Sequence, residues 1–83
     1  MLRLPLGKLK IFSGSDLCKL LSMHDFVNVR QKGSHIRMIT EINGKHAITI
    51  PAHDPIKIGT LNAIMIDIAQ HLEISKDEII KKL

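Results

Sequence analysis

Residues 35–50 contain the pattern that most restricts how this chain can fold. Two short tracts rich in β-branched residues, HIRMIT at 35–40 and KHAITI at 45–50, lie on either side of an Asn-Gly pair. Tracts of this kind around Asn-Gly are typical of an antiparallel β-hairpin. A hairpin is not stable alone in water, so the remaining segments of an 83-residue chain have to cover its apolar face.

The length of the hairpin loop determines which side chains share that face. A three-residue loop over 42–44, with its glycine in the left-handed conformation, pairs Met38 with Ile48 and Ile36 with Ile50. Four apolar side chains then lie on one face of the sheet. We favour this register because it makes the fullest use of the apolar residues.

A two-residue Asn-Gly loop is the alternative, and it sets Arg37 opposite Ile50. In the favoured register, His35, Arg37 and Thr49 lie together on the face opposite the apolar one, because neighbouring side chains in a strand alternate.

The segments around the hairpin supply one more strand and three helices. A helix over 14–23, capped by Ser13 or Ser15, carries a leucine stripe, and FVNVRQ at 26–31 predicts a first strand. A longer amphipathic helix begins at Thr60 or Gly59 and reaches residue 72. The spacing Ser-x-x-Glu from residue 75 predicts a short last helix.

These elements predict an α+β fold in the order α-β-β-β-α with a short extra C-terminal helix. A three-stranded antiparallel sheet carries both main helices on its apolar face, and the face with His35 stays open. We expect residues 13–83 to form a single domain and residues 1–12 to form an N-terminal extension.

Positive charge is concentrated in the first part of the chain. Residues 1–50 carry eight Lys or Arg against three Asp or Glu, a balance of +5, whereas residues 51–83 carry four against five, a balance of −1. A polyanion such as nucleic acid fits this distribution, with an ordinary solvated surface as the alternative. Two Phe and no Tyr or Trp leave little for stacking unpaired bases, which argues against a groove that binds single strands through aromatic platforms.

Cys18 is the single cysteine and falls in a helical apolar pattern, which favours a reduced, structural thiol. No apolar run reaches the roughly 18 residues that a membrane span needs, and the N-terminal dozen residues do not have the pattern of a signal peptide. We therefore expect a cytoplasmic protein with no membrane partner.

Three motifs resemble the HicA family of small bacterial toxins: FVNVRQKGSH at 26–35, IPAH at 50–53 and GTL at 59–61. The similarity runs from about Ser13 to Leu72. It implies a fold similar to the double-stranded-RNA-binding domain, activity as an mRNA endoribonuclease, and inhibition by a HicB-type antitoxin. The family's catalytic histidine follows Gly-Ser and corresponds to His35. Many members carry a second histidine directly after it, where this chain has Ile36, which the strand alternation assigns to the core.

The expected chemistry is metal-independent and needs no cofactor. Histidine can accept or donate a proton near neutral pH, so His35 suits the proton transfer that lets a ribose 2′-hydroxyl attack the adjacent phosphate. Neighbouring cations would offset the charge at that phosphate, a glycine turn lets the backbone of the RNA approach, and a serine hydroxyl can bind a phosphate oxygen. The expected RNA-binding residues are Arg30, Lys32, Gly33, Ser34, Arg37 and His53.

A second proton-transfer group is open at this stage. His53 is one candidate, provided that its loop folds back toward residue 35, and a basic side chain or a substrate oxygen are the others. His46, beside the Asn-Gly loop, is expected to be exposed, and His24 and His71 lie near helix ends. The histidine spacings match no zinc pattern.

Two other functions fit the same residues. One is a non-catalytic module that grips RNA by shape and charge. The other is an interaction protein whose basic tract docks an acidic partner. Replacing His35 by alanine distinguishes them from a nuclease, because only a nuclease would lose its activity.

Overall fold

The computed structural model describes residues 13–81, and the expected N-terminal extension, residues 1–12, lies outside the described part of the chain. The order of elements confirms the α+β architecture expected from the sequence. Within the described residues, no helix has both the length and the apolar character that crossing a membrane requires. The elements are α2 (Gly14–Ser22), β1 (Val27–Lys32), β2 (His35–Thr40), β3 (His46–Pro51), α3 (Ile58–Leu72) and α4 (Lys76–Ile80).

The sheet is antiparallel, with β2 between β1 and β3. Met38 pairs with Ile48 and Ile36 pairs with Ile50, so the register expected for a three-residue loop is confirmed. Gly44 has a φ of 94°, in the region that favours glycine, as that loop requires. The register therefore places the apolar residues of both strands on a common face.

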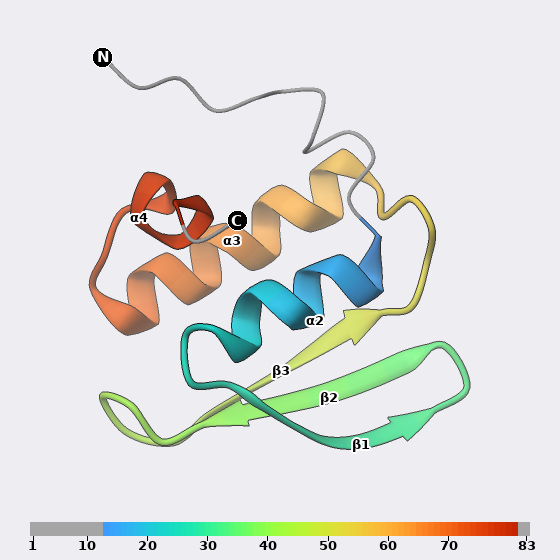
Figure 1. Ribbon diagram of the computed structural model, residues 1–83, viewed down its shortest axis with the longest axis horizontal. Helices are drawn as coiled ribbons and strands as arrows, with labels where there is room; N and C mark the ends of the chain where they lie inside the picture. Colours follow the sequence, from blue (N-terminus) through green and yellow to red (C-terminus); the bar gives the residue numbers. More distant parts are fainter. Residues whose placement is uncertain (1–12, 82–83) are drawn as a thin grey trace.

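The three helices lie on one side of the sheet, and the other side is open (Figure 1). Met38 and Ile50 are fully buried on the helix side. His35, Arg37 and Thr49 are exposed on the open side, as the alternation predicted.

The core lies between the sheet and the helices and is almost entirely aliphatic. It contains the leucines of α2, the apolar stripe of α3 and two isoleucines of α4, which close the end of the layer. Its buried members are Leu17, Leu20, Leu21, Phe26, Ile36, Met38, Ile50, Ile56, Leu61, Ile64, Met65, Ile68, Ile79 and Ile80.

Helices α2 and α4 begin where their capping residues predicted. The backbone N–H of Asp16 donates to Oγ of Ser13 at 3.0 Å, and the N–H of Ser13 donates to the Asp16 carboxylate at 3.2 Å, which completes a capping box. At α4, the N–H of Glu78 donates to Oγ of Ser75 at 3.1 Å.

The start of α3 differs from the expectation. The helix begins at Ile58 rather than at Gly59 or Thr60, and its N-cap, Lys57, makes no side-chain capping bond. The N–H of Leu61 donates to the carbonyl oxygen of Lys57 at 2.8 Å. Burial of Ile56 just before this point fixes the chain against the core, so tertiary packing starts the helix ahead of the sequence signal.

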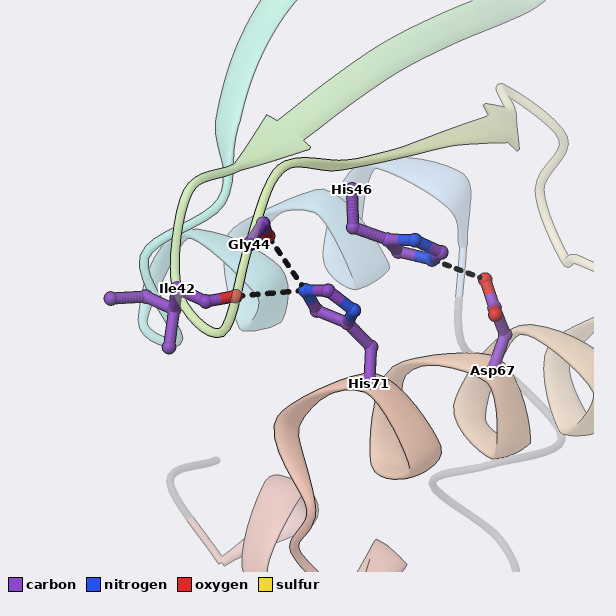
Figure 2. Close-up of polar contacts among 5 residues, drawn as sticks. All are labelled: Ile42, Gly44, His46, Asp67 and His71. Carbon is purple, nitrogen blue, oxygen red and sulfur yellow. Dashed lines mark hydrogen bonds and ion pairs between the residues drawn. The ribbon is translucent and has the colours of Figure 1, made fainter.

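The expectation that His46 is exposed is wrong. It is half-buried at the start of β3, where its ring stacks on that of His71 with 4.3 Å between centroids (Figure 2). His46 donates from Nε2 to the Asp67 carboxylate at 3.0 Å, and His71 donates from Nε2 to the carbonyl oxygens of Ile42 at 2.8 Å and Gly44 at 3.0 Å. These contacts fasten the β2–β3 loop to the end of α3. The sequence could not show this, because the partners lie more than twenty residues apart.

Candidate functional site

A shallow hollow on the open face of the sheet, here called the His35 hollow, brings together four of the residues expected at the site. It has a volume of about 170 Å³, and its lining comes from all three strands. The lining residues are Arg30 and Lys32 of β1, His35 and Arg37 of β2, and Thr49 of β3. All of them are exposed, so a ligand as large as a nucleic-acid backbone can reach His35 directly.

A β-bulge in β1 sets which residues enter this hollow. The register shifts between Asn28, which pairs with Met38, and Arg30, which pairs with Arg37. In a regular strand of the same length, strict alternation would put Asn28 and Arg30 on the same face. With the bulge, Arg30 and Lys32 join the open face while Asn28 faces the helices. No residue type in this tract signals the bulge.

Two cations of the His35 hollow face each other across the sheet, because Arg30 lies opposite Arg37, and the third, Lys32, lies opposite His35. Among the described residues, neither these three cations nor His35 forms an ion pair, and no carboxylate lines the hollow. Like charges in directly opposite positions destabilise a sheet, so this arrangement does not serve the fold. It suits the binding of an anion.

The turn beside the hollow contains Gly33 and Ser34, which join β1 to β2 in a two-residue connection closed by the pairing of Lys32 with His35. Gly33 has a φ of 58°, and an added Cβ would meet no atom within 4 Å. Glycine is therefore needed for its backbone conformation, and the space around it is open. Both residues are exposed next to the hollow, but they are not part of its lining.

His53 does not lie beside His35. The loop after β3 does fold back, because the N–H of Ala52 donates to the carbonyl oxygen of Ser34 at 2.7 Å. However, the carbonyl oxygen of His53 accepts the N–H of Gly14 at 2.8 Å, which draws this residue toward the start of α2. Its side chain lines a different hollow, on the helix side of β1.

This second hollow, here called the Gln31 hollow, has a volume of about 350 Å³. Its polar lining comes from β1, the start of α2 and the loop after β3, and includes Asn28, Gln31, Ser15, His53 and Asp54. Sequence reasoning missed it, although alternation alone puts Gln31 on the opposite side from Arg30 and Lys32. Cys18 also lines it, and burial raises the pKa of that thiol, which keeps it neutral.

Gly14 allows the loop after β3 to lie directly against α2. A Cβ at this position would collide with the carbonyl oxygen of Pro51 and lie 2.9 Å from Cα of Ala52. Only glycine therefore permits this close approach of two backbones. The approach forms one side of the Gln31 hollow.

The open face is not uniformly basic. At the end away from the β1–β2 turn, a third hollow is lined by Val27, Val29, Ile39 and Ile42, with two carboxylates at Asp25 and Glu41. Val27 is 61% exposed and Val29 is 52% exposed, which is high for large apolar side chains. We call this the apolar end of the open face.

A family model described as the HicA toxin of bacterial toxin-antitoxin systems matches residues 14–70. Every residue that lines the His35 hollow falls inside this range. Searches among curated proteins and among solved structures found no match.

Proposed function

The chain belongs to the HicA family of toxins from bacterial toxin–antitoxin systems, and from this premise we propose that it is an endoribonuclease that cuts mRNA with His35 as its catalytic residue. The observation that carries the proposal is the His35 hollow, in which one exposed histidine lies among three cations and no carboxylate of the described residues contributes to the lining. Its lining fits a phosphodiester approached from the open face.

The proposed reaction uses the RNA's own 2′-hydroxyl as nucleophile. Its oxygen attacks the adjacent phosphorus, the bond to the 5′-oxygen breaks, and a 2′,3′-cyclic phosphate and a 5′-hydroxyl are left. One proton leaves the 2′-hydroxyl and another is delivered to the 5′-oxygen. Histidine suits either transfer, because imidazole exchanges its proton near neutral pH. The route needs no metal ion.

The cations stabilise the charge that develops on the phosphate. Arg30 and Arg37, in opposite positions on β1 and β2, can donate hydrogen bonds to two phosphate oxygens. Gly33 and Ser34, at the turn, contact the RNA backbone as it enters. These roles account for the like charges that the sheet holds together.

We assign the second proton transfer to Lys32, with a substrate oxygen as the alternative. Lys32 lies directly opposite His35 across the β1–β2 ladder, whereas His53 lines the other hollow. A lysine in this position also adds positive charge beside the leaving oxygen.

We propose that a HicB-type antitoxin inhibits the protein by covering the open face. The apolar end of that face supports a protein partner, since burial of Val27 and Val29 stabilises a protein complex and contributes little to binding a phosphate backbone. An mRNA substrate places the proposed activity in the cytoplasm.

The test is cleavage of a long single-stranded mRNA by the purified protein and by His35→Ala, both in excess chelator. We expect the variant to cut about 10²- to 10⁴-fold more slowly, the usual contribution of a positioned acid or base. His35 is exposed, so the variant should unfold at the same temperature as the wild type. If both proteins bind RNA equally and neither cuts, the chain is a non-catalytic RNA-binding module.

A further inference from the structure

We infer that the Gln31 hollow binds an unpaired nucleobase of the RNA, next to the phosphate that occupies the His35 hollow. This inference rests on the proposed nuclease function, because it concerns the base beside the cut. It also defines the substrate class more narrowly, since a base can leave its stack to enter a protein hollow only where the RNA is single-stranded or locally unpaired.

The two hollows lie back to back across the same pair of strands. Gln31 stands between Arg30 and Lys32 on β1, and its cross-strand partner is Ile36, which follows His35. One residue along either strand therefore separates the phosphate-binding side from the base-binding side. β1 is an edge strand, so an RNA chain can pass around it from the open face to the helix side.

The lining of the Gln31 hollow is suited to a base and poorly suited to a phosphate. Asn28 and Gln31 carry amides, which offer donors and an acceptor to a base edge, and no lysine or arginine among residues 13–81 contributes to the lining. The carboxylate of Asp54 would repel a phosphate, whereas it can accept a hydrogen bond from the amino group of a base. Phosphate contacts position a nucleic acid and base contacts select its sequence, and the two hollows divide in the same way.

The amides are also available to a ligand. The side-chain oxygen of Asn28 accepts the N–H of Arg30 at 3.1 Å, which orients the amide and leaves its NH₂ group for another acceptor. Within residues 13–81, the side chain of Gln31 makes no hydrogen bond, and it is exposed at the mouth of the hollow. The buried side chain of Ile36 and the half-buried Cys18 provide apolar contact for the face of a base.

The volume fits this ligand. A hollow of about 350 Å³ lies at the lower end of the range of roughly 300–1,000 Å³ in which proteins bind small molecules. The His35 hollow, at about 170 Å³, is about half that size.

The experiment uses a pool of single-stranded RNAs that share their flanks and contain a randomised stretch, with the cut ends identified by sequencing. We expect the wild type to prefer one base, or one pair of bases, at a fixed position beside the cut. Gln31→Ala should reduce that preference on the order of tenfold, since a good amide–base contact discriminates by about this much. Gln31→Glu, which keeps the size but loses the donor, should change which base is preferred.

Gln70→Ala is the matched control, because Gln70 is an exposed glutamine on α3 that lines neither hollow, and it should keep the wild-type preference. Cleavage without base preference, or the same preference in wild type and Gln31→Ala, would overturn the base site and leave the nuclease intact. A wild type that cuts no member of the pool would overturn the proposed function and the base site with it.

Discussion

The His35 hollow and the Gln31 hollow are made from the same two strands, yet their chemistry differs. On the open face, three cations surround a histidine, whereas on the helix side the lining is made of amides, hydroxyls, a histidine and a carboxylate. The residues Arg30, Gln31 and Lys32 alternate between the two. A tract that looks uniformly basic in the sequence is therefore divided by the strand into a charged side, with Arg30 and Lys32, and an uncharged side, with Gln31.

The first prediction tests this division with neighbouring residues. Lys32→Ala should slow cleavage on the order of 10²-fold at every site, because it removes charge stabilisation at the phosphate. Its base preference should stay that of the wild type, and the dependence of binding on salt should become weaker by about one charge. The measurement is the cleavage rate and cut-site profile at several salt concentrations. A changed base preference in Lys32→Ala would show that the two hollows do not act separately.

The second prediction concerns a substitution at Gly14, where the loop after β3 lies directly against α2 beside the Gln31 hollow. Gly14→Ala should lower the free energy of unfolding by about 1–3 kcal/mol, because the new Cβ collides with the backbone of the loop after β3. In a domain of this size, each kcal/mol lowers the melting temperature by about 4–8 °C, so thermal unfolding measures the effect easily.

Gly59→Ala is the control for that experiment. A Cβ at Gly59 meets no atom within 4 Å, and the residue lies inside α3, where alanine is favoured over glycine by about 1 kcal/mol. This variant should therefore be as stable as the wild type or more stable. Equal melting temperatures for wild type and Gly14→Ala would mean that the close approach of the loop to α2 is not maintained in solution.

The third prediction concerns the contact between α3 and the β2–β3 loop, which belongs to neither hollow. His71→Ala removes two hydrogen bonds to the loop and the stacking on His46, and should cost about 1–2 kcal/mol of unfolding free energy (Figure 2). Cleavage measured well below the melting temperature should match that of the wild type. A loss of cleavage in a folded His71→Ala protein would show that this end of the molecule acts on the site.

The smallest effect is expected at Cys18. Burial raises the pKa of its thiol, so less thiolate is present at neutral pH and alkylation should be a few-fold slower than that of a free cysteine. The rate should rise with pH as the thiol ionises. Mass spectrometry after timed exposure to iodoacetamide measures it, and reaction at the rate of a free thiol would contradict the burial.

Sequence reasoning succeeded where local signals and burial agree. The apolar pairs Met38–Ile48 and Ile36–Ile50 left one satisfactory register for the hairpin, and from that register the positions of His35 and Arg37 on the open face followed. The capping residues Ser13 and Ser75 marked two helix starts for a similar reason, since their hydrogen bonds are made within a single turn.

It failed where distant segments decide the outcome. The exposure of His46 depends on α3, and the direction of His53 depends on a hydrogen bond to Gly14, more than thirty residues away. The faces of β1 depend on an extra residue in the ladder, which no residue type in the tract marks. The His35 hollow was therefore expected in part, and the Gln31 hollow was not expected at all.

The bulge in β1 has a consequence for how this site can change. The pairing of Lys32 with His35 holds one end of the strand and the pairing of Asn28 with Met38 holds the other, so deletion of Val29 would make the ladder regular and leave both faces as they are. A regular ladder of the present length would instead move Asn28 from the helix side to the open face, and Val27 would move the other way. The separation of the two chemistries is thus encoded in the place of the extra residue as well as in the side chains. Loss of the bulge at constant strand length, with every side chain kept, would be enough to merge them.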